Sequence, residues 1–347
     1  MIVGAIVIAG MLAGLGAWLM FRSRRRNTSD SSLPSRPKKP MLSGVPPDAA
    51  RAGLANNLMT ERLWKLAFAA PSEPQAAEPA QAKIGDAVCA ILQKDTLDPK
   101  YFPRRPSLMP QLLRAVEDPG AATEKLSRMI AHDPVLTSDV LRLANSAMYR
   151  TSAAPIETIQ RAIVVLGAEA LRGLVATAML QPVFRATRSN FPRFPRMLWD
   201  RTERAVRAAE MYTLKTQPQD RFEAQLVILM SALGPLVVYG VTLDVYSSRP
   251  KITPSPALCV ALTAALGAQV SMRIARHWET SPRLIAAIER SPDETLTMAL
   301  CVGELLATLS LLETQHVIAP DEALATAGDV GLEPAIIAPI WERLTSP

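Results

Sequence analysis

An adjacent histidine and aspartate form the most chemically suggestive pair in this sequence of 347 residues. His132 and Asp133 could bind a divalent metal ion, because imidazole and carboxylate groups together hold such an ion, which then activates water. The residue that follows offers a different explanation. Asp133 precedes Pro134, and this order is typical of a helix start, where aspartate accepts a hydrogen bond and proline occupies the first turn. We therefore interpret Asp133 as a helix cap and not as a ligand.

The other residues that could do chemistry lack partners at suitable spacing. His277 and His316 have no set of Cys, Asp or Glu around them that matches a metal site. Three cysteines stand alone in apolar runs, which indicates buried free thiols in a reducing cytoplasm. They are Cys89, Cys259 and Cys301. The sequence contains no P-loop, GxSxG, GxGxxG or CxxC motif.

Five short helices are predicted between residues 103 and 184, and clear breaks separate them. Apolar residues recur at helical spacing over residues 108–116, 126–130, 136–144, 156–166 and 171–178. The third helix follows Asp133 and is expected to end at Asn145, whose side-chain amide can bond the backbone of the loop that reaches Ile156. The fourth helix ends before Gly167, a residue suited to the left-handed backbone that closes many helices.

These residues resemble a known family. The run MIAHDPVLTSDVLRLANSAMYR (129–150) and the run IETIQRAIVVLGAEALRGLV (156–175) are similar to the HDOD family, the metal-less relatives of HD-type phosphohydrolases. The resemblance is strongest over residues 103–290 and implies an all-α domain used in bacterial signalling, with no chemistry of its own. The family-motif residues, to which we assign structural roles, are Asp133, Pro134, Asn145, Ser146, Leu166, Gly167 and Trp278.

The second half of the chain resembles the part of the HD fold that holds metal in catalytic relatives. An HD-type hydrolase needs a histidine on one helix, a His-Asp pair on another and a further aspartate. By the resemblance, the first histidine position falls near Arg201, and the His-Asp positions fall on Ser231 and Ala232. Relatives often have His-His where this chain has Arg290 and Ser291. Because an arginine repels a metal cation, the resemblance implies no metal, no cofactor and no catalysis.

An uncharged stretch at residues 2–21 is long enough to cross a membrane as one helix. The positive residues that follow it are Arg22, Arg24, Arg25 and Arg26. A cleaved signal peptide has its positive residues first, so we expect a retained anchor. Positive charge stays in the cytoplasm, which predicts a single-pass protein of the bacterial inner membrane with its C-terminal domain in the cytoplasm. Gly10 and Gly14 form a GxxxG pair, which leaves a homodimer open.

The positive charge of the chain is concentrated in one segment. Residues 22–39 carry seven Lys or Arg and one acid, a net charge of +6, and the whole chain is also +6 (38 − 32). The remainder therefore sums to zero and has no excess charge for contacts with nucleic acid phosphates. We expect the basic cluster to contact anionic lipid and the cytoplasmic domain to bind other proteins.

Composition along the chain and the family resemblance together predict four segments. They are a transmembrane anchor (1–21), a basic Pro/Ser-rich linker (22–47), a helical N-terminal extension that contains a Pro/Ala-rich linker (48–102), and an HDOD-type helical domain (103–347). The loop at residues 184–196 is expected to give way to helix at Leu198.

Two further stretches, 226–243 and 255–272, are uncharged and long enough to span a membrane. Gly234-Pro235 interrupts the first, and small or polar residues dilute the second, so we expect both to be core helices of the cytoplasmic domain. The stretch 296–312 is predicted to be an amphipathic helix.

The favoured function is a non-catalytic, membrane-anchored signalling protein whose HDOD-type domain binds other proteins or a small signal. The alternatives are a divergent HD-type metal-dependent phosphohydrolase or phosphodiesterase with unusual ligands, and a nucleic-acid-binding regulator. The missing His/Asp set argues against the hydrolase, and the charge distribution argues against the regulator.

Overall fold

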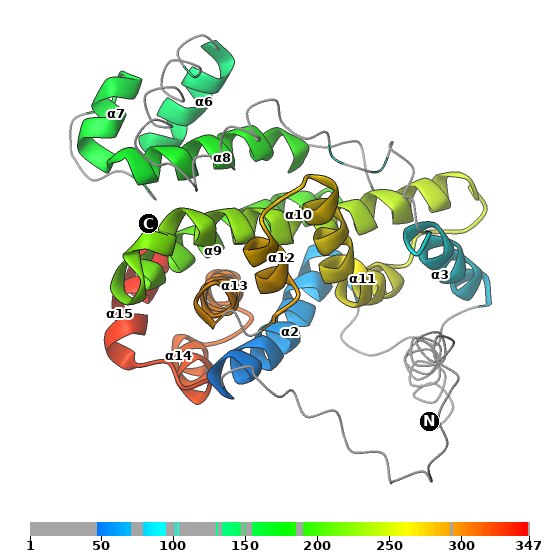
Figure 1. The fold of residues 1–347 in the computed structure, drawn as a ribbon. Helices are drawn as coiled ribbons and strands as arrows, with labels where there is room; N and C mark the ends of the chain where they lie inside the picture. Colours follow the sequence, from blue (N-terminus) through cyan, green and yellow to red (C-terminus); the bar gives the residue numbers. More distant parts are fainter. Residues whose placement is uncertain are drawn as a thin grey trace, which may run out of the picture.

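The computed structural model describes residues 47–70, 79–94, 101, 103, 130, 134–146, 149, 155–184, 190–291 and 294–345. Helices joined by turns and loops make up these residues, and none of them forms a strand, which confirms the predicted all-α class (Figure 1). Residues 1–46, which hold the predicted anchor and all but the last residue of the predicted basic linker, lie outside the described residues, as do the stretch 104–129 and the proposed cap Asp133.

The described helices come from both halves of the chain. In chain order they are α2 (Pro47–Ala67), α3 (Pro79–Leu92), α6 (Pro134–Ala144), α7 (Ile159–Leu166), α8 (Ala168–Phe184), α9 (Arg193–Thr216), the short 3-10 helix η2 (Pro218–Asp220), α10 (Arg221–Ser247), α11 (Pro256–His277), α12 (Pro282–Ile288), α13 (Glu294–Thr314), α14 (Pro320–Asp329) and α15 (Pro334–Thr345).

Helix α13 is the centre of the larger helical layer. Helices α2 and α9 pack along it, and α10, α12, α14 and α15 also contact it (Figure 1). Between residues 296 and 312 every side chain is buried except that of Met298, which is half-buried. The prediction of an amphipathic helix here was wrong, because neighbouring helices cover α13 on all sides and leave no face to solvent.

Three helices in the described part of the chain are long and apolar enough to cross a membrane. They are Pro218–Ser247, Pro256–His277 and Leu296–Thr314. Their most apolar stretches are 78%, 50% and 89% buried within the fold, respectively. Their length and composition are compatible with membrane association, while packing inside the domain already accounts for most of the apolar surface of α10 and α13.

Helix α10 is continuous through Gly234 and Pro235, where the sequence suggested an interruption. Proline has no N–H, so the carbonyl of Ser231, four residues earlier, loses its partner in the helix. The Ser271 hydroxyl on α11 donates to that carbonyl over 2.6 Å and accepts from the Gly234 N–H over 2.9 Å. A Cβ at Gly234 would lie 2.0 Å from the carbonyl oxygen of Gly267. The close crossing of α10 and α11 therefore requires glycine at position 234. It also brings in the Ser271 hydroxyl, which replaces the donor that Pro235 lacks.

Helices α6, α7 and α8 form a second layer, and α8 contacts α9 and α10 (Figure 1). Asn145 connects the end of α6 to the start of the next helix. Its side-chain amide donates to the Leu141 and Ile156 carbonyls (2.9 and 2.8 Å) and accepts from the Ile156 N–H (2.7 Å). These contacts confirm the predicted hydrogen bonds between the Asn145 amide and the backbone of the loop at Ile156. The Ser146 hydroxyl donates to the Leu143 carbonyl (2.7 Å) at the same helix end.

Two helix ends differ in detail from the sequence prediction. Gly167 has the expected positive φ (+85°), but its ψ of 162° lies outside the left-handed helical region, and its N–H bonds the Ile163 carbonyl. Helix α9 begins at Arg193, five residues before the predicted Leu198. Pro195 lies in the first turn of α9, where a missing N–H costs no helical hydrogen bond.

Candidate functional site around Glu304

Glu304 on α13 is a buried carboxylate surrounded by donors from other helices. Its side chain accepts hydrogen bonds from Asn56 Nδ2 (3.0 Å), Ser231 Oγ (3.1 Å) and Arg290 Nη2 (2.9 Å). Arg201 Nη1 lies 3.8 Å from Oε1 of the same carboxylate. We call these five residues the Glu304 cluster. They come from α2, α9, α10, α13 and the end of α12.

Arg201 is held in place by contacts on each side of its guanidinium. It is 5% exposed, and it donates through Nε to the Thr308 hydroxyl (2.9 Å) and through Nη2 to Asn56 Oδ1 (3.2 Å). Its guanidinium carbon lies 5.8 Å from the centre of the Trp64 ring, within the range of a cation–π contact. Asn56 thus bridges Arg201 and Glu304, so α2 is part of the site.

Arg290 is positioned by the way α12 ends. Its N–H bonds the Ala287 carbonyl, the Ser291 N–H bonds the Ala286 carbonyl, and its φ is +57°. This is a Schellman ending, in which glycine usually takes the position of Arg290. A left-handed non-glycine residue costs about 1–2 kcal/mol. The ion pair with Glu304 and the contact of Nη1 with Cys301 Sγ (2.7 Å) offset that cost.

The electrostatics of the cluster favour an ionised Glu304. Burial raises the pKa of the Glu304 carboxyl, but Arg201, Arg290 and the Ser231 hydroxyl lower it, and the net pKa is below the usual value. Burial lowers the pKa of Arg201, although Glu304 opposes that shift. Two guanidiniums and one carboxylate leave a net charge of +1. A carboxylate bonded to donors inside a net positive cluster is a poor ligand for a metal cation, which the guanidiniums would repel.

The structure brings together some of the residues predicted from the sequence. Arg201 and Ser231 meet at Glu304, and Arg290 joins them. Ala232 is buried beside Ser231 and offers no polar group. The sequence reasoning missed Glu304 and Asn56. A usable signal was present, because Glu304 is the only charged residue in the apolar stretch 296–312.

The remaining motif residues lie outside the Glu304 cluster. Pro134, Asn145, Ser146, Leu166 and Gly167 belong to the layer of α6–α8. Trp278 is fully buried at the end of α11, where its backbone N–H bonds the Ile274 carbonyl (2.8 Å).

Other candidate ligands are dispersed. His277 and His316 are exposed, Cys259 and Cys301 are buried, and Cys89 is half-buried. Within the described ranges, no three His, Cys, Asp or Glu residues gather in a way that could hold a metal ion.

Comparison with known proteins gives a family and a fold. The HDOD domain model matches residues 102–293. A candidate metal-dependent phosphohydrolase from Shewanella amazonensis SB2B has a similar structure, with a TM-score of 0.56, 16% identity, and coverage of 77% of this chain and 99% of that chain. An HDOD domain protein of unknown function from Geobacter sulfurreducens gives a TM-score of 0.51, 18% identity, and coverage of 76% and 88%. The search of curated proteins found no match. Because the family model matches more than half of its residues, this chain belongs to the HDOD domain family.

Proposed function

We propose that this protein is a non-catalytic, membrane-anchored regulatory protein whose HDOD domain binds other proteins in the cytoplasm. The observation that supports the proposal is that four side chains surround the Glu304 carboxylate, namely those of Arg201, Arg290, Ser231 and Asn56. Two of these residues stand where the family resemblance places metal ligands in catalytic relatives. Guanidinium groups supply the positive charge that a metal would supply, but they provide no Lewis-acid site and no bound water to activate.

The cluster also explains how the domain keeps its shape without metal. It joins five parts of the fold through one carboxylate, as a structural ion would join them. Breaking a buried ion pair by removing one partner costs about 3–5 kcal/mol, so the arginines and Glu304 depend on one another. In this proposal the cluster has a structural role, and the surface of the domain binds other proteins.

Membrane anchoring belongs to the same proposal and rests on the uncharged residues 2–21 and the arginines that follow them. Positive residues beside an anchor stay in the cytoplasm, and each contributes about 1 kcal/mol near an anionic leaflet. Cytoplasmic and periplasmic reporters fused after Ser248 test the topology. A cytoplasmic signal is expected, and a periplasmic signal would contradict the single-pass arrangement.

The absence of catalysis is tested on the full chain purified in a nonionic detergent. Elemental analysis and hydrolysis assays with nucleotides and cyclic dinucleotides should show no stoichiometric transition metal and no turnover. A full-occupancy ion that activates hydrolysis would instead support a divergent HD-type phosphohydrolase. In that case, Arg201→Ala and Ser231→Ala would show whether the cluster is the catalytic centre.

Binding of other proteins is tested by crosslinking in intact cells, followed by purification from membranes and mass spectrometry. A specific partner should be recovered with the full chain. The matched control carries residues 1–47 fused to a fluorescent protein, which keeps the predicted anchor and linker but lacks the HDOD domain. Equal recovery of the partner with this control would place recognition outside the domain.

A further inference from the structure

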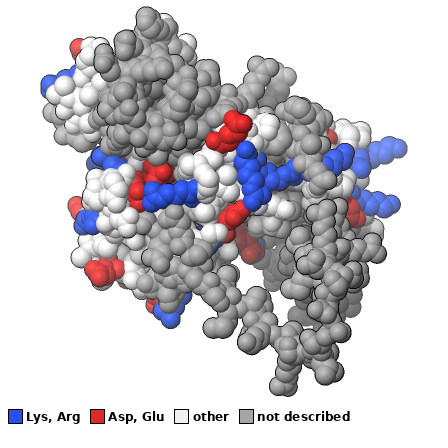
Figure 2. All heavy atoms as spheres, viewed as in Figure 1, with Lys and Arg blue, Asp and Glu red and all other residues white. Residues whose placement is uncertain are grey.

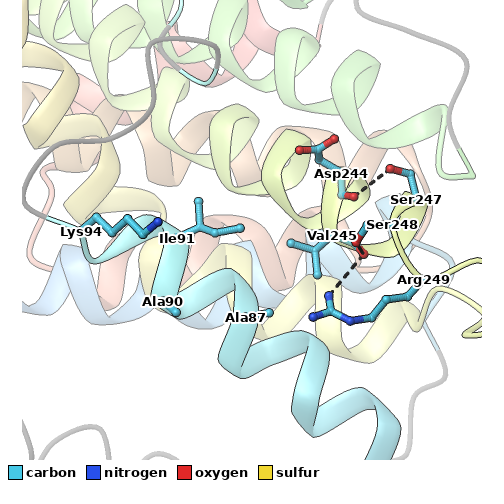
Figure 3. Close-up of a pocket in the computed structure, with 9 residues that line it drawn as sticks. All are labelled: Ala87, Ala90, Ile91, Lys94, Asp244, Val245, Ser247, Ser248 and Arg249. Carbon is cyan, nitrogen blue, oxygen red and sulfur yellow. Dashed lines mark hydrogen bonds between the residues drawn. The ribbon is translucent and has the colours of Figure 1, made fainter.

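A groove of about 550 Å³ lies between the second half of α3 and the end of α10 (Figure 3). None of its lining residues belongs to the Glu304 cluster. Its volume is within the range of pockets that hold small organic molecules. The groove therefore offers a second place where the protein could bind a ligand.

The floor of the groove is apolar. Helix α3 contributes Ala87, Ala90 and Ile91, and α10 contributes Val245 (Figure 3). The neighbouring face of α3 is buried, and its apolar residues there are Ile84, Val88 and Leu92. Ala87 and Ala90 have only a methyl group each, so they leave a hollow that larger side chains would fill.

The polar rim of the groove is cationic. Lys94 lies at the α3 end and Arg249 at the α10 end, where Nη1 of Arg249 is 3.5 Å from the Val245 carbonyl (Figure 3). Among the described residues that line the groove, Asp244 is the one carboxylate, and it accepts a hydrogen bond from the Tyr101 hydroxyl (2.5 Å). Two cations and one carboxylate give these lining residues a net charge of +1.

The surrounding structure holds the rim in place. Arg273 on α11 donates to the carbonyls of Leu92 and Lys94 at the end of α3, which fixes the backbone at Lys94 and offsets the negative end of the helix. The Tyr246 hydroxyl on α10 donates to Gln81 Oε1 on α3 (2.6 Å). Because both walls are tied together, little ordering is needed when a ligand enters.

The region around the groove is also positive. Residues 79–101 and 244–256, the two stretches of sequence that contain the lining residues and Tyr101, carry five Lys or Arg and four Asp, a net charge of +1. In Figure 2, Lys and Arg side chains project at the end of the molecule where α3 and the end of α10 lie. This field would attract anions toward the groove and disfavour cations.

We propose that the groove binds a small organic anion, with a carboxylate or phosphate group at Lys94 or at Arg249, which line different ends of the groove, and an apolar body on the alanine floor. A charge-assisted hydrogen bond from either cation would fix the anionic end, and burial of the apolar body would supply the rest of the affinity. The anion can be a free small molecule or the head group of a lipid, since both carry the same chemistry.

The test uses the full chain in a nonionic detergent and measures binding of 1-naphthyl phosphate by calorimetry. Saturable binding is expected, together with much weaker binding of neutral 1-naphthol. Lys94→Ala with Arg249→Ala should weaken binding of the phosphate about tenfold or more, because each charged hydrogen bond contributes substantially. Lys215→Ala on α9 is the matched control, since this exposed lysine neither lines the groove nor belongs to the positive region around it and should leave binding unchanged.

A filling variant tests the apolar floor independently. Ala90→Trp should abolish binding of 1-naphthyl phosphate while the melting temperature stays close to that of the parent, because residue 90 is exposed. Phosphatidylglycerol added to the detergent micelles that displaces the probe, when phosphatidylcholine added in the same way does not, would identify a lipid head group as the source. No displacement by either would identify a free anion. Absent binding, equal affinity for 1-naphthol, or unchanged affinity in the double alanine variant would each overturn the proposal.

Discussion

The hydroxyl of Ser271 donates a hydrogen bond of 2.6 Å to the carbonyl oxygen of Ser231. This carbonyl has no partner within α10, because Pro235 stands where the donor would be. The side chain of Ser231 reaches Glu304, with Oγ 3.1 Å from Oε1. Ser231 therefore receives a hydrogen bond from α11 at its carbonyl and contacts the buried carboxylate through its side chain. The α10–α11 crossing thus supports the geometry of the Glu304 cluster.

Removal of the Ser271 hydroxyl should destabilise the domain. Ser271→Ala leaves the Ser231 carbonyl without its donor, and an unsatisfied buried group costs about 1–3 kcal/mol. Pro235→Ala supplies an N–H that can donate to the same carbonyl, so Ser271→Ala should cost less in that background. Urea unfolding followed by circular dichroism measures both free energies. If the cost of Ser271→Ala is the same in the two backgrounds, the hydroxyl does not compensate for the proline.

Loss of the Glu304 charge should have a larger effect. Glu304→Ala leaves Arg201 buried without its ion pair and should lower the free energy of unfolding by about 3–5 kcal/mol. The matched control is Glu322→Ala, since Glu322 pairs with Arg62 at the surface, where both side chains are about half exposed. That exposed pair should contribute about 0–1 kcal/mol. Similar losses in the two variants would show that the Glu304 cluster does not hold the fold together.

The pH dependence of Glu304 has a definite sign. Because its folded pKa is depressed, its contribution to stability is present above the pKa of the unfolded chain and is lost as the pH falls through the folded pKa. Glu304→Gln keeps the shape of the side chain but removes this titration. Acid unfolding of the parent should therefore show a loss of stability that the glutamine variant lacks.

Sequence patterns predicted the local features of the fold and fewer of its long-range ones. Helix ends at Asn145 and Gly167 were predictable, because capping depends on residues a few positions away. The burial of α13 was not, since apolar spacing does not show how many neighbours will cover a helix. The Glu304 cluster was recognised only in part. Asn56 and Glu304 are 248 positions apart, and no local pattern connects them.

Glu203 on α9 should make the stability of the domain sensitive to pH near neutrality. Burial raises the pKa of Glu203, and the charge of Asp200 raises it further. A hydrogen bond with Trp199 and the charge of Arg142 lower it in part, and the resulting pKa is about 7. A raised folded pKa means that the stabilising effect is complete below about pH 4.5 and is lost as the pH rises through 7. The loss between these limits is about 3 kcal/mol, from about 1.4 kcal/mol for each pKa unit.

Glu203→Gln tests this dependence. The glutamine side chain carries no charge, so the variant should be more stable than the parent at pH 8 and should show a flatter profile between pH 5 and pH 8. Glu61→Gln on the exposed face of α2 is the control and should keep the profile of the parent, because Glu61 pairs with Lys65 at the surface. A parent profile that is already flat over this range would contradict the raised pKa.

Substitution of Asn145 tests whether the layer of α6–α8 serves in packing or in recognition of a partner protein. Asn145→Ala removes the hydrogen bonds to both backbone groups of Ile156 and should cost about 1–3 kcal/mol. Ser146→Ala is the neighbouring control and should cost about 1 kcal/mol or less, because its hydroxyl bonds only a carbonyl of its own helix. Thermal melts and pull-downs of the full chain are measured side by side.

If Asn145 is structural, its alanine variant should lose partner binding only in proportion to the loss of folded protein. Leu143→Ala sets that proportion, since Leu143 is 3% exposed and the cavity left by its removal should cost about 2–5 kcal/mol. An Asn145→Ala variant that melts like the parent and no longer retains the partner would assign the amide to recognition. We expect the structural outcome, because two of the three hydrogen bonds made by the amide are to one residue of the following loop, and the third is to the preceding helix.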